Sequence, residues 1–292
     1  MTTVTVRAPG KVNLQLSVGP LRDDGFHHLV TVFQAVSLFD DVTVTHSDRL
    51  RVRTFGESEV PTDENNLAGK AAMLLAERIG VEPLVDIRIT KRIPVAGGMA
   101  GGSADAAAAL VACASLWEAE LDLFQLAAQL GSDVSFSLLG GMALGEKRGE
   151  VLTALPSRST QHWVFAFADT LLSTPMVYGE FDRIRGTEVP DPTRSEDLLR
   201  ALDGGDPVEI GQALTNEMEP AALALAPSLR ATLTAGRSAG ALGSIVSGTG
   251  PTCAFLARDE AHAHELVVAM EASGTCRSAR YAYGPVAGPV TR

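Results

Sequence analysis

Cysteine, lysine and long apolar runs are scarce in this chain, and each scarcity excludes a class of protein. The three cysteines, Cys113, Cys253 and Cys276, are widely spaced and form no CxxC pair, so neither a disulfide framework nor a structural zinc site is expected. No apolar run reaches the length of a membrane span, and the first residues lack the charged head and apolar core of a secretory signal. We therefore expect a cytoplasmic protein without a membrane partner.

Positive charge is also in short supply. The formal net charge is −11 at pH 7 and no basic arm is present, which argues against binding to nucleic acid. A site for a polyanionic small molecule would need local cations that act against this negative field. Lysine occurs only at Lys11, Lys70, Lys91 and Lys147. A compact ammonium in a chain that otherwise uses arginine is a candidate for a specific task.

The rest of the composition is typical of a folded protein. The chain has 292 residues, of which 46% are hydrophobic and 20% charged, enough for one large or two ordinary domains. A proline and serine segment at 156–160 predicts a boundary between domains at 1–157 and 158–292.

Alternating apolar and polar residues predict the first strands. Segments 3–7 and 12–18 alternate and are separated by Pro9-Gly10, which predicts two strands joined at a bend. Lys11 and Asn13 lie two residues apart, so their side chains share one face of a strand. Further segments are predicted as strands at 42–45 and 50–54, joined in a hairpin or short meander, and as helices at 67–78, 122–130 and 207–218.

The most informative segment is 94–104, here called the glycine stretch, which has four glycines in six positions. It lies between a predicted strand at 85–90 and an alanine-rich predicted helix at 104–117. Glycines at a helix entrance let the backbone approach an anion, and the unpaired amides and the helix dipole attract it. We therefore predict a phosphate-binding loop, with Ser103 capping the helix or touching a phosphate.

Two known glycine motifs do not match this stretch. No lysine follows Gly101-Gly102, as a P-loop requires, and Met99 stands where a dinucleotide fingerprint has glycine. The simple alternative is a flexible turn that happens to be rich in glycine.

Asp133 is the carboxylate with the most unusual position. It follows the helix predicted at 122–130, which Gly131 stops, and a carboxylate is disfavoured beside the carbonyls of a helix C-terminus. This hints at a function, although an N-cap of a following helix is the commoner reason for an aspartate here. His27 and His28 have no further ligand group nearby, and His262 and His264 lie two apart on a predicted helix and point away from each other, so no metal held by the protein is predicted.

Three segments, 8–14, 94–104 and 246–251, together resemble the three signature motifs of the GHMP kinases. Within that superfamily the chain resembles the branch that acts on a cytidine-diphospho sugar alcohol. The residues that carry this resemblance are Lys11-Val12-Asn13-Leu14, Asp24-Gly25-Phe26-His27 with Thr31-Val32-Phe33-Gln34, and Gly131-Ser132-Asp133-Val134. The motifs come in the same order and extend over essentially the whole chain.

The resemblance implies an α+β fold of two domains with the active site in the cleft between them. The N-terminal domain would be like domain 2 of ribosomal protein S5, and the C-terminal domain would be ferredoxin-like. The implied activity is ATP-dependent phosphorylation of the 2-hydroxyl of the sugar alcohol, in the non-mevalonate (MEP) route to isoprenoid precursors. The implied cofactors are ATP and Mg²⁺ bound to the nucleotide, and the expected state is a monomer or weak homodimer.

Site residues follow by matching each motif to the family. Asp133 would be the general base and Lys11 its partner at the acceptor hydroxyl. Asn66 and Lys91 match positions near the adenosine. The implied phosphate-binding residues are Pro94, Val95, Ala96, Gly97, Gly98, Met99, Ala100, Gly101, Gly102, Ser103 and Ala104. The implied substrate-binding residues are Asn13, Phe26, His27, Phe33, Thr174, Pro175 and Tyr178. The third motif contributes Gly248, Thr249 and Gly250.

The implied cytidine pocket uses aromatic rings to stack the base and an imidazole for its polar edge, whereas ordinary core packing is the alternative for these rings. The chain departs from the family pattern at three positions. Phe26 stands in place of tyrosine, Ser135 in place of proline, and Pro251 where small residues are usual. None of these changes removes a charged or nucleophilic group.

Other functions remain open at this level. A GHMP relative that only binds nucleotide or sugar has no need of a base such as Asp133. A module of the ribosomal-protein kind would bind RNA, which the acidic charge opposes. Mevalonate-type and homoserine-type kinases are the nearest rivals, and neither needs the segment at 24–27.

Overall fold

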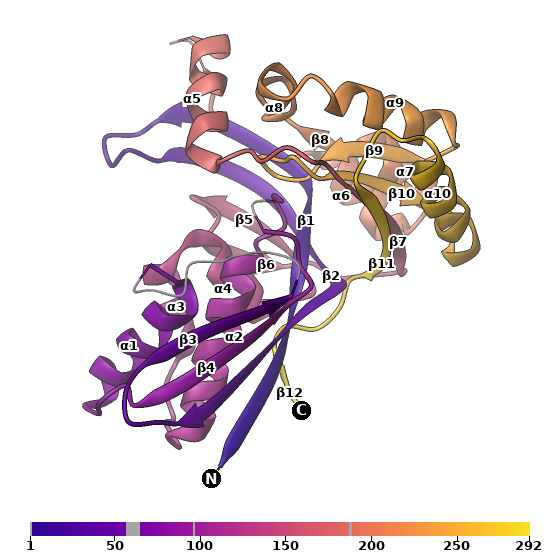
Figure 1. The fold of residues 1–292 in the computed structure, drawn as a ribbon. Coiled ribbons are helices and arrows are strands. Elements are labelled where there is room, and N and C mark those ends of the chain that lie inside the picture. The colour runs from indigo at the N-terminus through magenta and orange to yellow at the C-terminus, as the bar shows by residue number, and fades with distance from the viewer. Residues whose placement is uncertain (1, 57–64, 96, 187–188) are drawn as a thin grey trace.

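The structure is a computed structural model, and it describes residues 2–56, 65–95, 97–186 and 189–292. Two β-sheets and the helices around them make up the fold (Figure 1). The first sheet is built on two long antiparallel strands, β1 (Thr3–Leu21) and β2 (His27–His46). Beside the later half of β2 lies β4 (Val85–Lys91), and the edge is β3 (Arg51–Gly56). Beside the earlier half of β2 lie β5 (Met142–Lys147) and β6 (Val151–Ala154).

Alternation explains why these segments form a sheet with one buried face. Val42, Val44, Ile87 and Ile89 are fully buried and alternate with polar or charged residues along β2 and β4. Their side chains pack against α1 (Leu67–Ile79) and α2 (Gly101–Leu116), together with α3 (Leu123–Leu130). Most of α2 is buried, and its alanines allow the helix to lie close to β1 and β2.

Two strand predictions for this half are wrong. β1 does not divide at Pro9-Gly10 but continues through it, because a register shift against β2 at this point accommodates a residue that has no amide hydrogen. The predicted hairpin of 42–45 with 50–54 is absent as well. β3 instead lies parallel to β4, and β4 separates it from β2.

The helix after the glycine stretch begins earlier than predicted. α2 starts at Gly101, and the residue before it, Ala100, takes a left-handed conformation with φ of 56°. Ser103 therefore lies inside the first turn and does not cap the helix, so the capping prediction is wrong.

The second sheet has the strand order β11-β7-β10-β9, with all neighbours antiparallel. In order along the chain, the four strands are β7 (Gln161–Phe167), β9 (Gly243–Val246), β10 (Cys253–Ala257) and β11 (Ser278–Gly284). The spatial order is thus fourth, first, third, second, which is that of a ferredoxin-like sheet, as expected.

Helices cover both faces of this sheet. Phe255 and Val164 point to one face, with α8 (Glu219–Leu225), α9 (Leu229–Ser238) and α10 (Glu260–Ala272). Trp163 and Leu256 point to the other face, with α6 (Glu196–Gly204) and α7 (Pro207–Ala213). The remaining helices are α4 (Ser132–Leu139), behind the cavity described below, and α5 (Thr174–Arg185) beside the β1–β2 ribbon (Figure 1).

The predicted helix at 207–218 is too long. α7 ends at Ala213 and is followed by β8 (Thr215–Asn216), which lies parallel to β1. The Asn216 side chain explains the break, since its amide nitrogen donates to the carbonyls of Val246 and Gly248 and its oxygen accepts from the Met218 amide.

The two halves of the chain are joined by paired strands and by a buried polar contact. The short strand β12 (Val290–Thr291) pairs with β1, so the last residues return to the first sheet. Trp163 Nε1 donates to Gln34 Oε1 at 2.7 Å, which ties the second sheet to β2. The boundary at 157/158 stays a prediction. In the described part of the chain, no helix combines the length and apolar character that crossing a membrane requires.

Candidate active site

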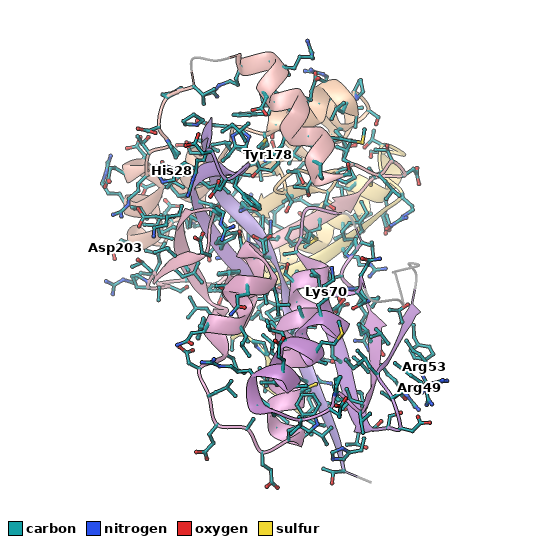
Figure 2. All side chains as sticks on the ribbon, turned by 90° about the vertical axis from the view of Figure 1, so that its left-hand side faces the viewer. His28, Arg49, Arg53, Lys70, Tyr178 and Asp203 are labelled. Atoms are coloured by element: carbon teal, nitrogen blue, oxygen red, sulfur yellow. The ribbon has the colours of Figure 1, made fainter. Side chains whose placement is uncertain are left out.

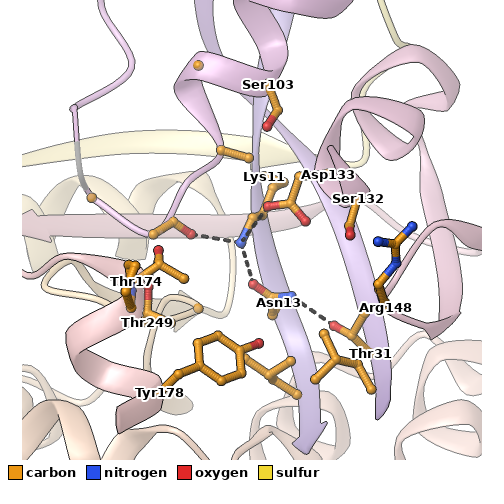
Figure 3. A pocket seen from close by; sticks show the side chains of 18 of the residues that line it. Lys11, Asn13, Thr31, Ser103, Ser132, Asp133, Arg148, Thr174, Tyr178 and Thr249 are labelled. Atoms are coloured by element: carbon orange, nitrogen blue, oxygen red, sulfur yellow. Dashed lines mark hydrogen bonds and ion pairs between the residues drawn. The ribbon is translucent and has the colours of Figure 1, made fainter. Parts of the chain in front are cut away.

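A cavity of about 850 Å³ lies at the middle of the β1–β2 ribbon, between the two halves of the protein. Residues from β1, β2, the glycine stretch, α4, α5 and the loop 247–250, here called the third-motif loop, line it (Figure 3). The segments singled out in the sequence are therefore brought together, although they lie far apart in the chain.

Lys11 is the cation at the centre of this cavity. Alternation along β1 places it on the same face as Asn13, as predicted, and its Nζ donates to Asn13 Oδ1 at 2.6 Å and to the Gly98 carbonyl at 2.8 Å. Asn13 Nδ2 in turn donates to Thr31 Oγ1 at 2.8 Å, which fixes the amide orientation. Burial lowers the pKa of Lys11, and the negative charge of Asp133 acts against this shift.

Asp133 faces Lys11 across the cavity. Its Oδ2 lies 3.9 Å from Lys11 Nζ, and its side chain is 35% exposed (Figure 3). Asp133 does follow a helix that ends at Leu130, as predicted, but the expected unfavourable setting beside that helix end is wrong, because Asp133 lies in the first turn of α4. It is not the N-cap either, since Gly131 has that position. The positive end of the α4 dipole therefore favours the carboxylate.

Most of the glycine stretch lines the cavity. The lining residues are Pro94, Val95, Gly97, Gly98, Ala100, Gly101, Gly102 and Ser103. Met99 and Ala104 are fully buried behind them, and Ala96 lies outside the described residues.

Gly98 joins this stretch to the third-motif loop. Its φ is +70°, and a Cβ at this position would come within 1.9 Å of the Ser247 carbonyl oxygen. Its own carbonyl accepts from both Lys11 Nζ and Ser247 Oγ, the latter at 3.1 Å. Packing between two loops, and not only access for an anion, therefore requires glycine here.

Lys91 lies in a buried cluster with two carboxylates. Its ammonium contacts Asp40 and donates to Asp105 Oδ2 at 2.7 Å, and all three side chains are at most 3% exposed. Asp40 also accepts the backbone amide of Ile93 at 2.9 Å, so the cluster holds the end of β4. Burial acts to lower the pKa of Lys91, but the two carboxylates together raise it. Lys91 and Asp105 line the cavity, yet the lysine charge is already paired.

The end of the cavity farthest from the glycine stretch is lined by aromatic rings, and we call it the aromatic end. Phe26 is half exposed, and the Arg148 guanidinium lies 4.8 Å from its ring centre. The Tyr178 ring lies 5.0 Å from the His27 ring, and burial, with Asp133 and Asp182 nearby, raises the pKa of the Tyr178 phenol.

The other predicted substrate residues lie along the walls. Phe33 lines the cavity but is buried and stacks on Phe136 at 4.7 Å. Thr174 and Pro175 begin α5, and the Thr174 hydroxyl lies 3.2 Å from that of Thr249. Gly248 and Thr249 line the cavity as well.

Besides Met99 and Ala104, two more predicted residues are not part of the cavity wall. Asn66 caps α1, with its side-chain oxygen accepting from the Ala68 amide at 2.9 Å, and Gly250, the last residue of the third-motif loop, lies close to the Val246 side chain. Lys70 is exposed on α1 (Figure 2) and is not among the residues that line the cavity.

Sequence reasoning missed several residues of the wall. Arg148 and Ser132 lie beside Asp133 (Figure 3), and Asp182 lies at the aromatic end. Helix periodicity could have identified Asp182, since this residue follows Tyr178 by four positions on α5. Within the described ranges no three histidine, cysteine or acidic side chains come together as a metal site.

Comparison with known proteins agrees with this geometry. The model for the GHMP kinases N-terminal domain matches residues 66–141, and the model for the C-terminal domain matches residues 197–276. A 4-diphosphocytidyl-2-C-methyl-D-erythritol kinase of Streptomyces avermitilis is 56% identical over 292 residues, which cover 98% of each chain. The chain belongs to this family of GHMP kinases. It is an ATP-dependent phosphotransferase, and the predictions of the enzyme class and of the two-domain α+β fold are confirmed.

Solved structures place this kinase in the same fold. The crystal structure of a 4-(cytidine 5′-diphospho)-2C-methyl-D-erythritol kinase matches with a TM-score of 0.80 and 35% identity, covering 96% of this chain and 98% of the other. A homoserine kinase from Cytophaga hutchinsonii matches with a TM-score of 0.78 but 21% identity, covering 100% and 98%, so this second likeness concerns the fold alone.

Proposed function

We propose that this kinase transfers the γ-phosphoryl group of ATP to the 2-hydroxyl of 4-diphosphocytidyl-2-C-methyl-D-erythritol, in the MEP route to isoprenoid precursors. The observation that carries the proposal is the pair of Lys11 and Asp133, 3.9 Å apart in a cavity with the glycine stretch on one side and aromatic rings on the other. Such a cavity has room for two substrates that meet at the pair.

The pair supplies what transfer to an alcohol needs. Asp133 accepts the proton of the hydroxyl as it attacks the γ-phosphorus, and this general-base step is worth about 100- to 10,000-fold in rate. The Lys11 ammonium offsets negative charge on the transferring group, and its hydrogen bonds to Asn13 and the Gly98 carbonyl hold it in place beforehand. Holding the hydroxyl between these two groups, in line with the γ-phosphorus, supplies the remaining rate enhancement.

ATP would lie along the glycine stretch, where the N-terminus of α2 and the hydroxyl of Ser103 face the cavity. Mg²⁺ fits this arrangement as a partner of the ATP phosphates, because it prefers oxygen ligands and the Ser103 hydroxyl lines the cavity in the first turn of α2. When bound, it would neutralise phosphate charge.

The aromatic end would hold the cytidine. Phe26 and Tyr178 offer ring faces for stacking, and His27 lies between them and the wall of β1. Arg148 is the cation placed to meet the substrate diphosphate, because no side chain in the described ranges hydrogen-bonds its guanidinium and the nearest carboxylate oxygen, of Glu150, lies 3.9 Å away. A cytoplasmic monomer or weak homodimer remains our prediction from the sequence.

The test is an assay of ADP formation with Mg²⁺-ATP and three candidate acceptors. We expect turnover with the cytidine substrate and none with mevalonate or homoserine, and the reverse pattern would overturn the proposal. Asp133→Asn should lower kcat by about 100-fold or more while ATP affinity is unchanged. Asp203→Asn is the matched control, because this aspartate is exposed on α6, far from the cavity (Figure 2). A large loss of ATP binding in Asp133→Asn would indicate a structural role instead.

A further inference from the structure

We propose that Asp182 recognises the base of the nucleotide substrate and makes this kinase discriminate cytidine from uridine. The inference rests on the proposed function and assigns a specificity-determining role to a carboxylate that no motif of the sequence singled out. The supporting observation is that the Asp182 carboxylate, which can only accept hydrogen bonds when ionised, lies beside His27 and Tyr178 at the aromatic end of the cavity.

The position of Asp182 is set by α5. It lies four residues after Tyr178, so the two side chains share the helix face that lines the cavity. Asp182 Oδ1 is 3.4 Å from His27 Nε2, and the carboxylate is 43% exposed. It is therefore accessible to a ligand, and its Oδ1 also lies beside the His27 ring.

The hydrogen position on His27 decides whether its Nε2 can donate to Asp182. Its Nδ1 lies 2.9 Å from the Gly19 carbonyl oxygen, and because a carbonyl only accepts, Nδ1 carries the hydrogen of that contact. A neutral imidazole then has only a lone pair at Nε2, so the Asp182 carboxylate keeps its accepting capacity for a ligand. The Tyr178 ring lies 5.0 Å from the imidazole with an angle of 30° between the planes. A base stacked beside these rings would thus meet the Asp182 carboxylate with an edge and not with a face.

Among the described residues no lysine or arginine pairs with Asp182, and its ionisable neighbour, His27, is a cation only when protonated. Two further carboxylates line the cavity among the described residues: Asp133, which lies 3.9 Å from Lys11, and Asp105, which accepts from Lys91 at 2.7 Å. Asp182 is the one at the aromatic end. In a cavity that receives two polyanions, a carboxylate raises the electrostatic cost of binding unless it makes a specific contact.

The two pyrimidines differ at the position that a carboxylate detects. Cytosine carries an exocyclic amino group, which donates, whereas uracil carries a carbonyl oxygen at the same carbon, which accepts. An ionised carboxylate only accepts, so it forms a hydrogen bond with cytosine and faces an oxygen in uracil. A contact of this kind is worth about 10- to 100-fold in discrimination.

The experiment compares binding of cytidine and uridine monophosphate to the intact enzyme by calorimetry, and then kcat/KM for the cytidine substrate and its uridine analogue. We expect the wild type to prefer cytidine about 10-fold or more in both measurements. Asp182→Asn places an amide nitrogen that donates to the uracil oxygen, so the preference should fall to about 3-fold or less. Asp182→Ala should weaken cytidine binding without strengthening uridine binding, and KM for ATP should stay constant.

Glu180→Gln is the control, since Glu180 lies on the same helix, pairs with Arg183 at 2.6 Å and is not part of the cavity wall. It should keep the wild-type preference. If Asp182→Asn keeps that preference too, the role given to Asp182 is wrong while the proposed function stands. If the wild type itself does not distinguish the two nucleotides, the cytidine assignment in the proposed function fails, and the role of Asp182 with it.

Discussion

Replacing Gly98 by alanine tests whether a single close contact fixes the position of the glycine stretch against the third-motif loop. The added Cβ would lie 1.9 Å from the Ser247 carbonyl oxygen, whereas ordinary contact begins at 3.4 Å, so the loops must part by about 1.5 Å. Alanine also takes the left-handed conformation of this position at a cost of about 1–2 kcal/mol. Because Lys11 and Ser247 both donate to the Gly98 carbonyl, the movement would displace the ammonium as well.

We expect Gly98→Ala to lower the free energy of unfolding by about 1–3 kcal/mol. It should lower kcat/KM by about 100-fold, since a displacement near 1 Å is enough for such a loss. Thermal denaturation and steady-state kinetics with both substrates measure the two effects. Wild-type stability together with wild-type kcat/KM would refute the reasoning.

Gly102→Ala provides the comparison within the same stretch. Its Cβ would meet only Leu67 Cδ1, at 3.6 Å, and the residue lies in α2 without a positive φ. The free energy of unfolding should stay constant or rise by up to about 1 kcal/mol. If phosphate approaches this position, KM for ATP alone should rise. The pair of variants thus separates a glycine needed for packing from one needed for the ligand.

Three further predictions concern charge and stacking. Because burial lowers the pKa of Lys11 below its ordinary value of 10.5, kcat/KM should fall on the alkaline side below pH 10.5, and a profile that stays flat up to that pH would contradict its role. Arginine hydrogen bonds lower the pKa of Asp41 to about 2, so Asp41→Asn should cost about 1–2 kcal/mol at pH 7. Urea unfolding should show that this cost disappears as the pH falls from 4 to 2, and an equal difference at pH 7 and pH 2 would exclude the ion pair as its source. Phe26→Ala and Arg148→Met should each raise KM for the cytidine substrate at least 10-fold, with KM for ATP constant, whereas parallel increases in both KM values would place these residues elsewhere.

The sequence predicted those helices and strands whose ends or faces are set by residues within the same segment. α1 and α3 were predicted within about one residue because Asn66 and Asp122 cap them with their side chains. The strand before the glycine stretch followed from its alternation. The prediction that Lys11 and Asn13 share a face depended only on β1 being a strand, and the structure shows a hydrogen bond between the two side chains.

Features that depend on distant partners were not predictable in this way. Pro9-Gly10 reads locally as a break, but β2 pairs with β1 on both sides of it and keeps the strand continuous. A helix after α3 was only an alternative, with Asp133 as its N-cap, but a single glycine separates the two helices and Asp133 lies inside the first turn of α4. The partners of Lys91 lie 51 and 14 residues away in the chain, and no periodicity connects them.

The unbroken pair of β1 and β2 also has a mechanical consequence. The same two strands carry β4 at one end and β8 at the other, so the halves of the enzyme are connected by a stiff ribbon in addition to loops. A register shift interrupts the hydrogen-bond ladder and bends the strand, and in β1 two such shifts, at Pro9/Gly10 and at Asn13/Gln15, flank Lys11. If one half of the enzyme rotates against the other, we expect the hinge to lie at Lys11. The rotation that closes the cavity on the substrates would then also position the Lys11 ammonium.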